Sequence, residues 1–167
     1  GWSDSLKTEN GDVDVPRARA LLDVYGWLDR DGDGWREQPD GQPLLLECAT
    51  QPDGLSRQRD ELMKKAMDAI GIRISFKSAK WPENLKTARA GKLMMWRVGN
   101  ASTVPDGQQI LQRLYGPETG QVNLARFRLK AFDEVFDRLT SLPDGPERAE
   151  LMRKAQLIAV AWAPYKV

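Results

Sequence analysis

The sequence is distinguished first by the residue types that it lacks. Histidine is absent from all 167 residues, and Cys48 is the single cysteine. Without histidine, the chain by itself forms no Ser-His or Cys-His catalytic group, no histidine-ligated metal site and no histidine proton relay. One cysteine allows neither an internal disulfide nor a cysteine-ligated zinc site. We therefore expect no enzymatic activity, no cofactor and no metal of these types.

An excess of one charge and long apolar runs are also missing. Lys and Arg total 25 against 24 Asp and Glu, so the formal net charge is +1. This balance gives no electrostatic basis for binding nucleic acid or an acidic membrane surface. The longest apolar stretches, such as residues 157–163, fall short of the ~20 residues that cross a bilayer. The first residues also lack the basic and apolar regions of a signal peptide.

Tryptophan is the one residue type in excess. The chain has six Trp against three Tyr and four Phe. Indole side chains serve ligand-binding surfaces as well as hydrophobic cores. Core packing is the more common role of any single tryptophan, so this excess alone assigns no function.

The order of patterns in the first half of the chain predicts a βαβ unit. Residues 1–16 are polar and indicate an extended N-terminal segment, followed by a helix over 17–25 that Gly26 caps. Strands are predicted over 43–50 and 72–76, with a four-turn helix between them and a right-handed crossover. The apolar stripe of that helix consists of Leu55, Leu62, Met63, Ala66, Met67 and Ile70.

The second half predicts mostly helices. A short helix begins at Trp81, a third strand is expected over 93–98, and residues 108–115 are predicted to be helical. Two further apolar stripes indicate helices near the C-terminus: Leu129, Phe132, Phe136 and Leu139, and then Leu151, Ala155, Ile158 and Trp162. The whole pattern is typical of an α/β domain with a short sheet and about six helices.

The most conspicuous local motif is an acidic loop. Asp29, Asp31, Asp33 and Gly34 match positions 1, 3, 5 and 6 of an EF-hand loop, where alternate carboxylates converge on one calcium ion. Asp40 falls at position 12, where the pattern requires a bidentate Glu, and the following residues form a turn rather than a helix. Two interpretations remain open: a calcium-stabilised interaction module built on residues 29–40, and a solvated turn.

A second candidate is carboxylate catalysis on one helix. Asp133 and Asp137 are i, i+4 neighbours, with Glu134 between them, and paired carboxylates could perform acid–base chemistry. Their spacing opposite Phe132 and Phe136 favours a solvent-exposed helix face instead. A hydrolase using Asp133 or Asp137 is therefore an alternative that requires both carboxylates to lie in a pocket.

The third candidate is the segment that leaves the predicted third strand. Trp96 and Arg97 end the strand, and Asn100 follows in a polar loop. Ligands of open α/β sheets bind beyond the carboxyl ends of the strands. We therefore expect Trp96, Arg97 and Asn100 to stack on and hydrogen-bond a small ligand.

Several short segments follow one another in an order that resembles family 5 of the bacterial extracellular solute-binding proteins, the dipeptide-, oligopeptide- and nickel-binding proteins of ABC importers. The similarity spans about residues 17–165 and rests on collinear order, since no single motif is specific. The segments are Ala-Leu-Leu-Asp-Val-Tyr-Gly-Trp (20–27), Asp-Arg-Asp-Gly-Asp-Gly-Trp-Arg-Glu (29–37), Asp-Gly-Gln-Pro-Leu (40–44), Ala-Ile-Gly-Ile-Arg-Ile (69–74), Val-Pro-Asp-Gly (104–107), Phe-Asp-Glu-Val-Phe-Asp (132–137) and Asp-Gly-Pro-Glu-Arg-Ala-Glu-Leu-Met (144–152).

The resemblance implies a fold and a function. The fold would be a type II periplasmic-binding-protein-like lobe with a short mixed sheet, and residues 17–167 would form part of the C-terminal ligand-binding lobe. The N-terminal lobe and the final tail would then be absent. The protein would bind a small, peptide-like solute between two lobes and deliver it to ABC permease subunits from the periplasm or the outer membrane surface. The lone lobe would bind weakly and could self-associate through apolar surface that the other lobe covers.

One departure from the family concerns the ligand. Peptide-binding relatives carry an acidic residue a few positions after the strand tryptophan, whereas no acid follows Trp96 before Asp106. Arg97 would favour an anionic or neutral ligand group instead of a free peptide amine. The resemblance also places the acidic loop on a surface away from the ligand, which argues against a calcium role.

Overall fold

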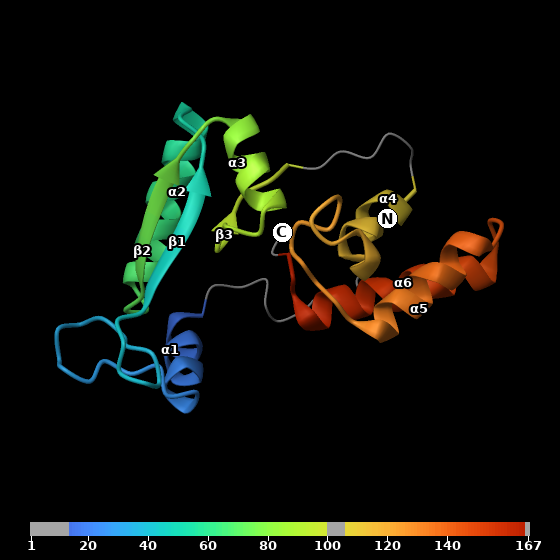
Figure 1. Cartoon of the computed structure of the whole chain (residues 1–167). Coiled ribbons are helices and arrows are strands. Elements are labelled where there is room, and N and C mark those ends of the chain that lie inside the picture. Colours follow the sequence, from blue (N-terminus) through green and yellow to red (C-terminus); the bar gives the residue numbers. More distant parts are fainter. Residues whose placement is uncertain (1–13, 100–105, 166–167) are drawn as a thin grey trace. The chain divides into compact units, whose positions relative to one another are not determined.

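The computed structural model describes residues 14–99 and 106–165, which divide between two compact units (Figure 1). The sheet unit comprises residues 14–87 and 93–97 of the described chain. The helical unit comprises residues 88–92, 98–99 and 106–165. No helix among the described residues is long and apolar enough to cross a membrane.

The sheet unit is built on three parallel strands. Its elements are α1 (Val15–Val24), β1 (Leu45–Thr50), α2 (Gly54–Asp68), β2 (Arg73–Ser78), α3 (Trp81–Arg89), whose last residues belong to the helical unit, and β3 (Met95–Trp96). The strand order is β2-β1-β3, and β1 pairs in parallel with both neighbours. The predicted α/β class and βαβ unit are confirmed, while the pairings of the described strands are parallel rather than mixed.

The two crossover helices cover opposite faces of this sheet. The chain moves from β1 through α2 to β2, and then back past β1 through α3 to β3. Right-handed crossovers in opposite directions place their helices on opposite faces. Figure 1 shows α2 running behind the two long strands. Side chains at the end of β3 therefore reach α2 on one face and α3 on the other.

The first helix begins earlier than predicted. We expected an extended segment up to residue 16, but α1 begins at Val15, and residues 1–13 lie outside the described part. The Asp14 side chain accepts a hydrogen bond from Arg17 N at 2.9 Å and so caps the helix. Pro16 lies in the first turn, where its missing N–H costs nothing. Gly26 adopts the predicted left-handed conformation, with φ of 77°.

The apolar stripe of α2 is only partly buried. Met63, Met67 and Ile70 are half-buried, whereas Leu55 and Leu62 are 56% and 70% exposed. A helix that covers a narrow sheet buries only the arc of side chains that faces the strands. Leu55, Leu62 and Ala66 belong to the predicted stripe and are nevertheless exposed.

The third strand is shorter than predicted. Residues 93–98 were expected to form it, but only Met95 and Trp96 pair with β1, opposite Cys48 and Ala49. Met94 is 62% exposed, and its sulfur accepts the Glu47 N–H at 3.3 Å. At the position before the Cys48–Met95 pair, the Met94 side chain thus takes the place of a backbone partner. Met95 and Trp96 are the residues of β3 whose backbone pairs with β1.

The helical unit follows the predicted stripes closely. Its elements are α4 (Gln108–Leu111), η3 (Gln112–Leu114), η4 (Gly116–Glu118), α5 (Lys130–Ser141) and α6 (Pro146–Trp162). They enclose one hydrophobic cluster, formed by Leu111, Leu114, Phe132, Val135, Phe136, Leu139 and Ala155. Phe132 and Leu139 are completely buried, as their spacing predicts. Trp162, the last residue of the α6 stripe, is instead 64% exposed and contacts Phe127 by its edge.

Candidate functional site

An aromatic pair lies at the carboxyl ends of the parallel strands. Trp96 ends β3, and Trp81 begins α3 three residues after β2 ends. Their rings stack with centroids 5.2 Å apart and planes inclined by 22°. Trp81 is 38% exposed and Trp96 is half-buried, so the pair presents indole surface to solvent. Such a surface binds flat or apolar ligand groups by stacking.

Arg97 takes a different direction from Trp96. Consecutive side chains near the end of a strand point to opposite faces, and Arg97 forms an ion pair with Asp60 of α2. Its Nη2 also donates to the Thr50 hydroxyl at 3.2 Å. Asp60 Oδ1 is buried and has no other polar partner among the described residues. The structure therefore separates the two predicted ligand contacts: Trp96 contacts α3, and Arg97 contacts α2.

Thr50 is the meeting point of the strand ends. Its carbonyl oxygen accepts the Asn84 side-chain amide at 2.8 Å and the Ala79 N–H at 3.0 Å, while its hydroxyl accepts Arg97. Asn84, 5% exposed, also donates to the Ala79 carbonyl at 3.1 Å. These bonds join the ends of β1, β2 and β3 and the start of α3 into one polar network.

The network also affects the single cysteine. Cys48 is 1% exposed on β1. Burial raises the pKa of its thiol, and the positive charge of Arg97 offsets part of that rise. Because the thiol is buried and its pKa is raised, Cys48 remains protonated at neutral pH and fills the core as a small apolar side chain.

Sequence reasoning identified only part of this site. Asn100 lies outside the described residues, so its predicted role remains a prediction. Asp60, Trp81 and Asn84 were not proposed as site residues. Asp60 and Asn84 resemble ordinary solvated helix residues in the sequence, and the position of Trp81 indicates only the start of a helix. The excess of tryptophan was the one signal that could have pointed to Trp81.

The acidic loop brings together a different set of carboxylates from the one predicted. Ligand oxygens of Asp29, Asp31 and the buried Glu37 lie within 4.8 Å of one another. Asp33 instead forms an ion pair with Arg73, whose guanidinium lies 5.4 Å from the centre of the Trp35 ring. Asp40 belongs to a separate turn and accepts the Gln42 N–H at 3.1 Å.

The carboxylates of this loop are largely occupied by backbone donors. Asp29 accepts the N–H groups of Gly32 and Gly34 at 2.8 and 2.9 Å. Asp31 accepts Asp33 N at 3.1 Å, and Glu37 accepts Arg30 N at 2.8 Å. Side chains that bond their own backbone in this way stabilise a turn. The geometry thus favours a self-satisfied turn over the EF-hand arrangement.

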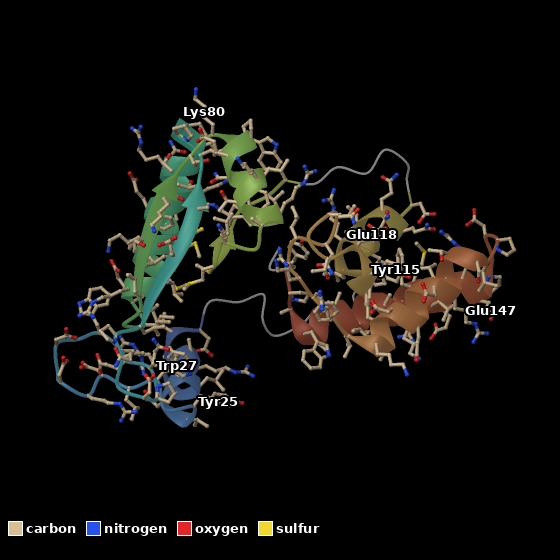
Figure 2. All side chains as sticks on the ribbon, in the orientation of Figure 1. Tyr25, Trp27, Lys80, Tyr115, Glu118 and Glu147 are labelled. Atoms are coloured by element: carbon tan, nitrogen blue, oxygen red, sulfur yellow. The ribbon has the colours of Figure 1, made fainter. Side chains whose placement is uncertain are left out.

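The carboxylates of α5 are engaged in structural contacts. Asp133 accepts the Gly116 N–H at 2.8 Å, and Asp137 accepts the Tyr115 hydroxyl at 2.5 Å. Tyr115 lies beside α5 (Figure 2), and its hydrogen bond to Asp137 raises the pKa of the phenol. Glu134 is exposed and lies 3.6 Å from Lys130. Asp133 borders an open depression beside η4, but Asp137 is exposed outside it. The two carboxylates therefore do not form the shared pocket that a hydrolase requires.

The sequence of this chain is similar to those of known bacterial binding proteins. Residues 1–121 match the model of the bacterial extracellular solute-binding proteins, family 5 Middle. Heme-binding protein A of Haemophilus influenzae is 26% identical over 166 residues, which make up 98% of this chain and 29% of that protein. Di/tripeptide-binding protein 2 of Pseudomonas aeruginosa is 29% identical over 172 residues, with 98% of this chain and 30% of that protein covered.

Solved structures show the same fold. The structure of HbpA2 from Haemophilus parasuis superposes with a TM-score of 0.81 at 20% identity, covering 98% of this chain and 31% of that chain. At this identity the likeness concerns the fold alone. The chain spans about 30% of the length of the curated relatives it matches.

Proposed function

Because the chain belongs to family 5 of the bacterial extracellular solute-binding proteins, we propose that it is part of the substrate-binding component of an ABC importer. In this role it binds a small, peptide-like solute between two lobes and passes it to membrane permease subunits. It works in the periplasm or at the outer face of the membrane and catalyses no reaction. The relative that is named a di/tripeptide-binding protein supports the peptide-like class.

The observation that carries the proposal is the stacked Trp81–Trp96 pair at the carboxyl ends of the parallel strands. This edge is where open α/β sheets bind ligands, and exposed indoles provide contact area at low entropic cost. The sequence predicts ligand contact by Trp96, Arg97 and Asn100, and we add Trp81 on the basis of the stacking. One lobe supplies only part of the contacts, so binding by this chain is expected to be weak.

A second copy of the chain is a further proposed partner. On α1 and its C-cap, Leu21, Val24 and Tyr25 are 50%, 80% and 70% exposed. Figure 2 shows Tyr25 at this end of the helix. Adjacent exposed apolar side chains of this size are typical of contact surfaces. Sizing chromatography over a concentration series tests this proposal, and a monomer at the highest concentration would contradict it.

The ligand assignment is tested by nuclear magnetic resonance of the indole N–H groups. Trialanine at millimolar concentration should shift the indole resonances of Trp81 and Trp96 and leave that of Trp162 unchanged. Trp96→Ala should weaken binding by about two- to tenfold, the worth of one aromatic contact, whereas Trp162→Ala should not. Shifts that spare both Trp81 and Trp96, or an affinity unchanged by Trp96→Ala, would refute the proposal.

A further inference from the structure

The residue that follows β3 is held by side chains rather than by backbone bonds. Backbone pairing with β1 ends at Ala49 and Trp96. The next position in this register would pair Thr50 with Arg97, and there the contact is the 3.2 Å hydrogen bond from the Arg97 guanidinium to the Thr50 hydroxyl. The side chains therefore extend the strand pairing by one residue.

Asp60 determines where that guanidinium lies. It reaches Arg97 from α2, on the face of the sheet opposite α3, and its side chain is 14% exposed against 32% for Arg97. An ion pair that is mostly buried requires both partners, because removing either leaves an uncompensated charge. Asp60 thus holds Arg97 in the position from which it reaches Thr50.

The same pairing removes Arg97 from direct contact with a ligand at the indoles. Its charge is compensated by Asp60, and its donors are directed to Asp60 and Thr50. Trp96, the adjacent residue, lies against Trp81 on the other face. A ligand stacked on the indoles would therefore meet an aromatic surface, while the charge of Arg97 is paired on the other face.

We propose that Asp60 and Arg97 are positioning residues: they pin the end of β3 to Thr50 and so hold Trp96 against Trp81. The inference rests on the proposed binding function and narrows it, because Arg97 then supplies no charge to the ligand group that stacks on the indoles. In this proposal Arg97 supports the site, in place of the ligand contact that the sequence predicts for it.

The first test uses the circular dichroism of the coupled indoles. Stacked indoles produce a paired positive and negative band, which Trp81→Phe should abolish and thereby assign. Asp60→Ala, the near-isosteric Asp60→Asn and Arg97→Met should each lose most of this band well below their thermal midpoints. Asp68→Ala is the matched control, since Asp68 lies on the same helix in an exposed pair with Lys64, and it should keep the band.

The double variant distinguishes positioning from general destabilisation. Asp60→Asn combined with Arg97→Met should lose no more of the band than either single change, because both act through one pair. Asp60→Glu keeps the negative charge at this position, so it should show the band that Asp60→Asn loses. A full band in folded Asp60→Asn and Arg97→Met proteins would overturn the proposal.

The second test separates support from ligand contact through peptide charge. Acetyl-trialanine carries a negative charge and trialanine amide a positive one, and both are titrated against the indole resonances. Arg97→Met should weaken both peptides by a similar factor of about two to ten, the worth of a disturbed aromatic contact. A selective loss of the anionic peptide would show that Arg97 contacts the ligand and would overturn the proposal. If no peptide shifts the indoles of any variant, the binding function fails, while the circular dichroism band still decides the positioning role.

Discussion

The two units of this chain are stabilised in different ways. The helical unit encloses a cluster that includes three stacked or tilted aromatic rings. The centroid of the Phe136 ring lies 4.9 Å from that of Tyr115 and 6.2 Å from that of Phe132. The buried apolar side chains of the sheet unit are aliphatic or small, such as Ile74, Cys48 and Ala49, and polar side chains join its elements. The unit with the weaker apolar core carries the candidate ligand site, and its rigidity depends on buried polar bonds.

The largest expected effect is in the helical core. Phe132→Ala should lower the free energy of unfolding by about 3–5 kcal/mol, because Phe132 is fully buried and the cavity cannot close completely. Hydrogen exchange should show the lost protection in α5 and α6 and leave β1 and β2 unaffected. Leu157→Ala on α6, 39% exposed, is the control and should cost far less. Equal losses of protection in both units would show that they unfold as one.

A smaller effect is expected for a polar anchor of the sheet unit. Arg36 donates to the Ile70 carbonyl at 2.8 Å and also reaches the Trp27 carbonyl and Asp23, with its side chain 11% exposed. Arg36→Met keeps much of the side-chain volume and loses these hydrogen bonds, so the free energy of unfolding should fall by about 1–3 kcal/mol. Urea titration measures the change, and Arg138→Met, in an exposed pair with Glu147, should be close to neutral. A neutral Arg36→Met would show that the sheet unit does not depend on polar bonds.

A pH effect tests a polar contact in the helical unit. The backbone N–H of Gln108 and the guanidinium of Arg148 hold the pKa of Asp106 below its ordinary value. Since the folded pKa is the lower one, the stabilisation is complete above the unfolded pKa of about 4 and disappears as pH falls through the folded pKa. Stability should therefore decline on acidification, and less steeply in Asp106→Asn. Urea titrations at a series of pH values measure the free energy of unfolding, and the same dependence of this free energy on pH in both proteins would contradict the prediction.

The smallest effect, close to none, is expected from calcium. Backbone N–H groups already bond the carboxylates of Asp29 and Asp31, and Asp33 pairs with Arg73. Millimolar calcium should leave the thermal midpoint unchanged, because only an ion bound to the native state raises it. A rise that Asp31→Asn abolishes would restore the calcium-stabilised module as a function of this loop.

The units also differ in how far their structure could be predicted. The spacing of Phe132, Phe136 and Leu139 predicts the buried face of α5, because one helix face packs against one core. In α2 the same kind of reasoning assigns too wide a face, since an apolar residue such as Leu62 carries no information on how much sheet lies beneath it.

The site shows the same limit more strongly. Trp96 could be identified because a strand end is visible in local sequence. The ion pair between Asp60 and Arg97 depends on the path of a crossover helix, and the burial of Asn84 depends on where α3 meets two strand ends. Such long-range polar pairing leaves no periodic pattern in a single sequence.

The short β3 strand has a consequence for the time course of folding. The bond between Thr50 and Arg97 joins residues 47 positions apart, whereas α5 and α6 are neighbours in sequence. Chain closure over long separations is slower than closure between adjacent helices. We expect α5 and α6 to pair early and β3 to dock late, so that the stacking of Trp96 on Trp81 follows that pairing.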